Sequence, residues 1–176
     1  MYEIRKSNIK GEGVFATRNI KKDKHIFNVN LSLLPSHTLE EIDKNPKLKA
    51  DGDHSDYVGH GKYVIDFSPA SYMNHSCAPS CYVKMKTIAS KDVYALRDID
   101  RGEELIHDYT LTSVDQFAGM VFWAEKCKCG SKNCRGILTG DFFTLPNDIQ
   151  LKFYRNLPPS IIRRYHHRFK KLTKNL

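Results

Sequence analysis

The sequence predicts a mainly β fold built from several short sheets, with a helical extension at the C-terminus. Two observations predict it. Short apolar runs with partial alternation follow one another through the first two thirds of the chain, separated by turn residues, which is typical of short strands in small sheets. Beyond residue 147 the apolar residues recur instead at helical spacing. A chain of 176 residues fits one domain with an appendage.

Alternation predicts the strands in chain order: His25–Leu34, Tyr63–Phe67, Tyr82–Ile88, Asp92–Arg97 and Glu104–Ile106. Between the first two, Thr38 and Glu41 form a capping-box pattern that opens a short helix ending before Pro46. The segment from Asp51 to Gly61 is polar and contains glycine, so we expect a solvated connection there.

Three helices are predicted towards the C-terminus. Residues 114–125 carry an apolar stripe with Ser113 as the cap. Asn147 is predicted to cap a second helix that runs to Asn156. After the Pro158–Pro159 pair a third helix begins at Ser160, and we expect its apolar face to pack on its own domain. That face consists of Ile161, Ile162, Tyr165, Phe169 and Leu172.

The positive charge is concentrated at the C-terminal end. The chain carries 28 Lys and Arg against 20 Asp and Glu, and the last acidic residue is Asp148. Eight cationic side chains follow it, so residues 1–148 are formally neutral and the whole net charge of +8 lies in the last 28 residues. This segment is either a solvated face or an electrostatic surface for an acidic partner such as nucleic acid or a nucleosome.

The remaining composition argues against a membrane protein. No apolar run approaches the roughly 18 residues of a membrane span, and the N-terminus lacks the apolar core of a secretory signal. We therefore expect an intracellular location and no membrane partner. In a reducing compartment, clustered cysteines favour metal binding over disulfides.

The cysteines predict a zinc site. Cys127, Cys129 and Cys134 form a C-x-C-x4-C pattern in which Gly, Ser and Asn allow the backbone to wrap a metal ion. Three thiolates suit Zn²⁺, which takes four tetrahedral sulfur or nitrogen ligands. The fourth ligand has to come from elsewhere, and the two remaining thiols are Cys77 and Cys81.

Three further segments carry residues that a simple β fold does not need. The first is Lys10-Gly11-Glu12-Gly13-Val14-Phe15-Ala16, the second is Tyr72-Met73-Asn74-His75-Ser76-Cys77-Ala78-Pro79-Ser80-Cys81, and the third is Gly102-Glu103-Glu104-Leu105-Ile106-His107-Asp108-Tyr109. We expect the second and third to meet the C-x-C-x4-C segment in space and to form one site.

Together, and in this order, these motifs resemble a SET-domain protein lysine methyltransferase with a post-SET zinc-binding segment. The resemblance covers about residues 4–136. It implies a SET domain over residues 1–126, a post-SET zinc segment over 127–136 and a basic helical extension over 137–176. It also implies a pseudoknot, in which the Asn-His segment and the segment ending in Tyr109 cross and bring Tyr109 beside Asn74.

The resemblance implies a function and a set of roles. The chain would use S-adenosylmethionine to methylate the ε-amino group of a protein lysine, with histones or nucleosomes as substrates and the nucleus or chromatin as its location if it acts on histones. Tyr109 would be catalytic, and Cys77 would be the fourth zinc ligand beside the three post-SET cysteines. The implied cofactor contacts are Lys10, Gly11, Glu12, Gly13, Asn74, His75 and Tyr109.

Three departures from the family pattern bear on activity. His107 stands where the family commonly has Phe or Tyr, at a position that influences how many methyl groups are added. Ala78 and Ser80 flank the proline where aspartate or asparagine is usual, and Phe27–Val29 lacks a tyrosine that commonly forms one wall of the lysine channel. The alternative interpretation is therefore a SET-fold binding module with little or no transferase activity.

Overall fold

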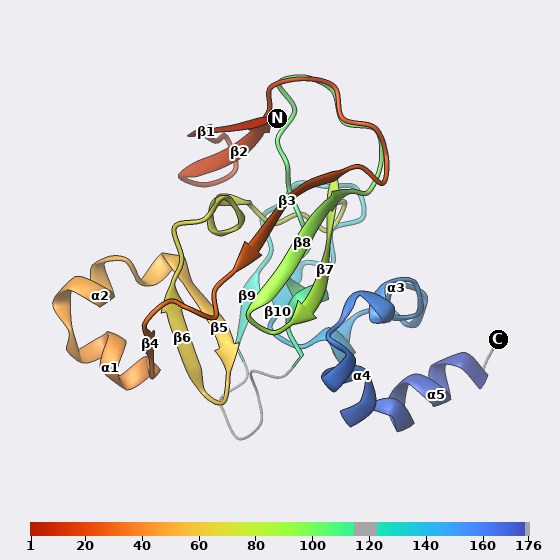
Figure 1. The fold of residues 1–176 in the computed structure, drawn as a ribbon. Helices are drawn as coiled ribbons and strands as arrows, with labels where there is room; N and C mark the ends of the chain where they lie inside the picture. Colours follow the sequence, from red (N-terminus) through yellow and green to blue (C-terminus); the bar gives the residue numbers. More distant parts are fainter. Residues whose placement is uncertain (115–122, 175–176) are drawn as a thin grey trace.

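The computed structural model describes residues 1–114 and 123–174. Within these ranges the strands form four small antiparallel sheets (Figure 1). Two sheets are hairpins, β1 (Tyr2–Lys6) with β2 (Glu12–Ala16) and β9 (Ala124–Lys126) with β10 (Ile137–Thr139). The strands of the other two sheets are β3 (His25–Asn30), β7 (Cys81–Thr87), β8 (Ser90–Ala95), β4 (Ser36–His37), β5 (Ser55–Gly59) and β6 (Lys62–Ile65).

The sheet β3-β8-β7 forms the centre of the main core. Its middle strand, β8, contributes Val93, which is completely buried, and β7 contributes Val83 and Met85 to the same cluster. Alternation along these strands separates core residues from exposed ones, for example in the burial pattern of β7. The strands predicted at 25–34, 63–67, 82–88 and 92–97 are therefore confirmed, with bounds that differ by a few residues.

The polar segment from residue 51 to 61 is more ordered than the sequence predicts. Pro46–Ala50 forms α2 after α1 (Leu39–Lys44), and β5 then pairs with β6 in a sheet to one side of the central one (Figure 1). The expectation of a solvated connection is wrong for β5, because its polar side chains have partners elsewhere in the fold. The capping box of Thr38 and Glu41 is confirmed by both of its hydrogen bonds.

The predicted strand at 104–106 is wrong as a regular element. Glu104 forms an isolated antiparallel bridge with Phe15, and His107 forms an isolated parallel bridge with His75. The segment therefore joins two different neighbours instead of one sheet.

This segment also crosses the Asn-His segment. The N–H of His107 donates to the carbonyl of Asn74, and the N–H of Ser76 donates to the carbonyl of His107. The N–H groups of Ser80 and Cys81 both donate to the carbonyl of Ile106. These bonds form the crossing that the resemblance implies.

The predicted helix over 114–125 lies largely outside the described residues. Its last two positions are in β9, so the predicted C-terminal end is wrong. Asn147 does not cap α3 (Asn147–Phe153), because Pro146 occupies the cap position and Asn147 is the first helical residue. The single helix expected from Ser160 is two helices, α4 (Pro159–Arg164) and α5 (His166–Lys174), separated at Tyr165.

The C-terminal helices close a second hydrophobic core. Phe142, Leu157, Ile161 and Phe169 are buried together with Val114, and Tyr82 of β7 packs against the same cluster. The prediction that the apolar face packs on its own domain is confirmed. In Figure 1, α3, α4 and α5 lie together on the side of the central sheet away from α1 and α2. Among the described helices, none has the length and apolar character needed to cross a bilayer.

Candidate active site and zinc knot

Tyr109 stands where the crossing segments meet. Its hydroxyl donates to the carbonyl of Met73 at 2.7 Å, and its backbone N–H donates to Nδ1 of His75 at 3.2 Å. Burial, followed by the negative charge of Glu104, raises the pKa of Tyr109 to about 12. The phenol therefore keeps its proton at neutral pH, and it can donate or accept a hydrogen bond but is not a ready base.

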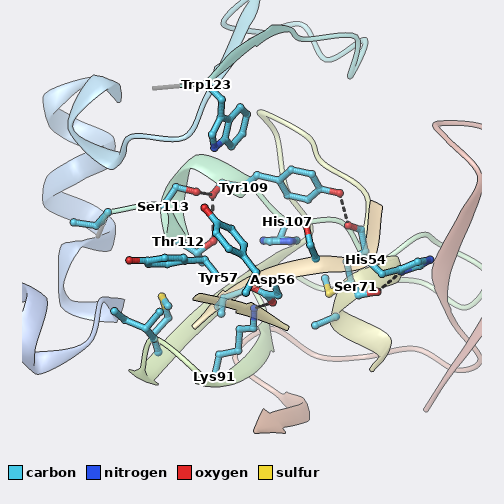
Figure 2. Close-up of a pocket in the computed structure, with 18 of the residues that line it drawn as sticks. His54, Asp56, Tyr57, Ser71, Lys91, His107, Tyr109, Thr112, Ser113 and Trp123 are labelled. Carbon is cyan, nitrogen blue, oxygen red and sulfur yellow. Dashed lines mark hydrogen bonds and ion pairs between the residues drawn. The ribbon is translucent and has the colours of Figure 1, made fainter. Parts of the chain in front are cut away.

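Tyr109 lines a cavity of about 510 Å³. Figure 2 shows its ring on one side of this cavity, with Trp123 above and His107 close by. Much of the lining is apolar, and it comes from both cores as well as from the β9–β10 hairpin. These apolar residues include Met73, Val83, Met85, Ile88, Val93, Val114, Leu138, Leu157, Pro158 and Ile161.

A charged pair lies in the same cavity beneath His107 (Figure 2). The ammonium of Lys91 on β8 pairs with the carboxylate of Asp56 on β5, and both side chains are largely buried. Nδ1 of His107 is buried and lacks a hydrogen-bond partner among the described residues. Burial, followed by the charge of Lys91, lowers the pKa of His107 to about 3, so the imidazole is neutral.

Asn74 connects the N-terminal glycine loop to the crossing. Its Nδ2 donates to Oε1 of Glu104 at 2.7 Å and to the carbonyls of Glu12 and Lys10 at 3.1 and 3.3 Å. Gly13 is required at its position because a Cβ there would overlap the Glu104 carboxylate. The loop is therefore held by its backbone against the crossing, with Gly11 at a positive φ of 51°.

The Asn74–His75 segment and the glycine loop are thus both connected to Tyr109. Asn74 and His75 are buried next to it, whereas residues 10–13 reach it through Asn74 and are not part of the cavity lining. His107 and Tyr109 both line the cavity, with ring centroids 4.9 Å apart. The glycine loop is therefore connected to Tyr109 through Asn74 and does not form part of the cavity wall.

The cysteines of the post-SET-like segment lie against Cys77. The ligand atoms of His75, Cys77, Cys127 and Cys129 all lie within 4.8 Å of one another. Cys134 is adjacent, because its thiol interacts with Cys127 and accepts the N–H of Gly136 at 3.4 Å. Cys77 accepts the N–H of Arg135 at 3.5 Å.

This arrangement fits zinc. In a regular tetrahedron with Zn–S bonds of about 2.3 Å the sulfur atoms are about 3.8 Å apart, and the sulfur atoms of Cys77 and Cys127 are 3.8 Å apart. Nε2 of His75 lies 3.5 Å from the sulfur of Cys77. Because Nδ1 of this ring accepts a hydrogen bond from Tyr109, Nε2 carries the proton and can donate to the thiolate.

Cys81 occupies a different environment from the other cysteines. It is completely buried in the main core at the start of β7, where its thiol contacts the hydroxyl of Ser80. Burial raises the pKa of Cys81 to about 12, which disfavours the thiolate that a metal needs.

A buried ion pair ties the cysteine segment to the segment that contains Tyr109. Both guanidinium nitrogens of Arg135 donate to the carboxylate of Asp108, at 2.7 and 2.8 Å. Asp108 precedes Tyr109, and Arg135 follows Cys134, so this pair fixes the two segments in register. Asp108 also accepts the N–H of Thr110.

Comparison with known proteins identifies the family. A model of the SET domain matches residues 11–110, which is more than half of the chain. The chain belongs to the SET-domain family. The predicted fold class, a SET fold of short β-sheets, is thereby confirmed.

The relatives of this SET domain include enzymes named histone-lysine N-methyltransferase. Set-2 of Caenorhabditis elegans is 30% identical over 145 residues, covering 78% of this chain and 9% of the relative. The H3 lysine-4 specific enzyme of Schizosaccharomyces pombe is 30% identical over 141 residues (75% and 14%), and the H3 lysine-36 specific enzyme of Saccharomyces cerevisiae is 30% identical over 150 residues (78% and 19%). This SET domain therefore spans less than a fifth of the length of each of these three relatives.

A crystal structure of a Plasmodium falciparum protein described as a histone methyltransferase aligns with 62% of the present chain and with 96% of its own chain. The sequence identity is 26% and the TM-score is 0.44.

Several cavity residues of this SET domain escaped the sequence interpretation. Asp56 and Tyr57 lie in the segment expected to be solvated, and Trp123 follows the residues that the structure leaves undescribed. Lys91 lies in the polar run Ser90-Lys91-Asp92 at the start of β8, and its partner is Asp56 on β5. That partner is remote in sequence, so the pattern alone could not name it.

Proposed function

We propose that this SET domain transfers methyl groups from S-adenosylmethionine to the ε-amino group of a protein lysine, with histones as the first substrate class. The observation that carries the proposal is the position of Tyr109. Its hydroxyl lies at the crossing of the two motif segments and on the wall of a cavity that the side chain of a lysine can enter. The names of the relatives support the histone class, and because they include both lysine-4 and lysine-36 enzymes of H3 they support no single target.

The cavity suits the chemistry. Bound S-adenosylmethionine supplies a methyl group on a positively charged sulfur, and the attacking amine has to be neutral. An apolar wall disfavours the ammonium form of an entering lysine. Of the charged residues that line the cavity, Lys91 and Asp56 pair with each other and so add little net field. We propose that the proton leaves through water, since Tyr109 holds its own proton.

Tyr109 is proposed to act as an electrostatic and positioning group. A neutral phenol at the meeting point can orient the amine and stabilise the polarised methyl, and alignment of the reacting atoms contributes several kcal/mol. His107, with its unpartnered Nδ1 in the same cavity, is proposed to influence how many methyl groups are added, because it can hydrogen-bond to the amine or to a water beside it.

The glycine loop and the Asn74–His75 pair are proposed to hold the methyl donor. Lys10, Gly11, Glu12 and Gly13 would contribute backbone groups, and Asn74, His75 and Tyr109 would complete the site. The support is the hydrogen bonding that holds the loop to Asn74 and Glu104 with its backbone close to the crossing.

Zinc is proposed to be structural, with Cys77, Cys127, Cys129 and Cys134 as ligands and His75 donating to the Cys77 thiolate. The proximity of Cys77, Cys127 and Cys129 supports three of these ligands, and the contact of Cys134 with Cys127 supports the fourth. The burial of Cys81 in the main core argues against Cys81 as a ligand. We also propose residues 1–126, 127–136 and 137–176 as SET, post-SET and extension segments. The pairing of β9 with β10 brackets the middle segment and supports its bounds.

Mass spectrometry tests the activity. Core histones and the protein itself are incubated with S-adenosylmethionine beside a Tyr109→Phe variant. We expect methylated lysines with the parent protein and a rate about 10²–10³-fold lower with the variant, which is the usual effect of removing one transition-state donor. Equal rates would contradict the role of Tyr109.

The alternative function is a SET-fold binding module with little or no transfer, and His107 is the feature that favours it. Calorimetry separates the two. Binding of S-adenosylmethionine without methylation of histones, of the protein itself or of a lysine-containing protein extract would establish the module. A nuclear or chromatin location follows only if histones are the substrate.

A further inference from the structure

The C-terminal extension carries an uncompensated basic surface. Lys170 and Lys171 on α5 and Arg163 on α4 are exposed, as are His166 and His167. Within the part of the chain that the structure describes, Arg168, Lys170 and Lys171 make no ion pair with a carboxylate. Some exposed lysines elsewhere, such as Lys21 and Lys44, do pair with acids.

Packing fixes the direction in which these cations point. Phe169 is 4% exposed and belongs to the second core, and Leu172 and Tyr165 pack against that core. The charged residues between them on α5 are therefore directed outward. A helix held in this way presents its charges on a rigid support, which a disordered basic tail does not.

The surface is also hollowed. A cavity of about 330 Å³ lies between α3 and α5, lined by Asn147, Gln150, His167, Arg168 and Lys171, together with Phe143 and Leu172. The guanidinium of Arg168 lies 3.8 Å above the ring of Phe143, which holds it in place at the hollow. Gln150 is committed to the carbonyls of Phe143 and Leu145, so the free polar groups at the hollow are mainly cationic.

We propose that this surface, defined by Arg163, Arg168, Lys170, Lys171 and His167, binds the phosphate backbone of duplex DNA. The nine residues of α5 extend about 13 Å, a length over which one DNA strand presents about four phosphates. Among the described residues of the extension, every Phe and Tyr packs against the second core, which disfavours stacking of single-stranded bases on them. The exposed cations therefore favour contact with the phosphates of a duplex over stacking with unpaired bases.

The location gives the surface a consequence for the proposed function. Leu157, Pro158 and Ile161 of the same extension line the cavity that contains Tyr109. DNA held on α5 would therefore lie beside the active-site cavity, and a protein bound to that DNA would be brought near it. The DNA binding itself does not depend on methyl transfer and is tested without it.

The test is fluorescence anisotropy with a labelled duplex of about 20 base pairs, over roughly 50 to 200 mM salt. The parent is compared with the triple variant Arg168→Gln, Lys170→Gln, Lys171→Gln. A matched control, Lys22→Gln, Lys24→Gln, Lys47→Gln, removes the same net charge from exposed positions outside the extension. In the triple variant we expect the magnitude of the slope of log K against log salt to be smaller by about 3, because each removed cation leaves one phosphate without its partner. In the control variant we expect the slope to stay near the parental value.

Three results would overturn the proposal. One is an equal loss of DNA affinity in the triple variant and in the control variant, which would mean that net charge alone attracts DNA. The second is binding of poly-glutamate as tight as that of the duplex, which would indicate an acidic protein partner. The third is tighter binding of single-stranded DNA than of the duplex. Unchanged thermal unfolding of both variants shows that a loss of binding is not a loss of fold.

Discussion

The ion pair between Asp108 and Arg135 gives the sharpest test of how the site is held together. The two side chains are 3% and 17% exposed and meet through two hydrogen bonds. Arg135→Met keeps much of the aliphatic volume but leaves the carboxylate of Asp108 buried without its cation. Breaking a buried pair in this way costs about 3–5 kcal/mol, and the partial exposure of Arg135 places the expectation near 3 kcal/mol.

Urea unfolding measures this loss. With an m-value of about 2 kcal/mol/M, a loss of about 3 kcal/mol lowers the midpoint by about 1.5 M. The matched control is Lys21→Met, which breaks the pair with Asp98 at a fully exposed position and should leave the midpoint nearly unchanged. The double variant Asp108→Asn, Arg135→Met removes both charges and should be more stable than Arg135→Met alone.

Two outcomes would refute the reasoning. A midpoint that falls by less than about 0.5 M would mean that water reaches Asp108 and that the pair does not hold the cysteine segment. A double variant less stable than the single one would mean that the unpaired charge of Asp108 does not destabilise the fold.

Three further predictions follow from the site. Burial and then the charge of Lys91 lower the pKa of His107 to about 3, below its unfolded value of about 6.5. The stability linked to this shift is complete above about pH 6.5 and is lost as pH falls towards 3. Between about pH 7 and pH 5, the free energy of unfolding should therefore decrease less in His107→Phe than in the parent. Gly13→Ala should weaken binding of S-adenosylmethionine in calorimetry, because its methyl group displaces the Glu104 carboxylate, while the metal content stays at the parental value. Cys77→Ser should lower the zinc content and expose the post-SET segment to protease, and retention of one firmly bound zinc per chain would contradict its role as a ligand.

Much of the fold could be predicted because the informative residues are local. The alternation of β7 and β8 and the motif around Asn74 each occupy a short window, and the family resemblance orders them. The break between α4 and α5 could not be predicted, because Tyr165 is neither glycine nor proline and the apolar spacing continues through it. The same holds for Asn147, a good cap residue that is displaced by the preceding proline.

The site could be predicted only in part, for a different reason. The cysteines are marked by their spacing and Tyr109 by the family resemblance, whereas the cavity is made by pairs of residues that are far apart in sequence. Asp56 and Lys91 are 35 positions apart, and each resembles a surface charge until the other is known. Ile161 resembles ordinary helix core, yet it also lines the cavity that contains Tyr109.

The bond between Ser7 and Glu104 spans 97 positions, and this has a consequence for biosynthesis. At about 5–20 residues per second, the N-terminal hairpin waits roughly 5–20 seconds on the ribosome before its partner is made. A lone two-stranded hairpin is marginally stable in water, so the glycine loop has no fixed form during that time. Translation products that stop before Tyr109 therefore contain most of the residues of the domain but lack the tyrosine around which the site is built.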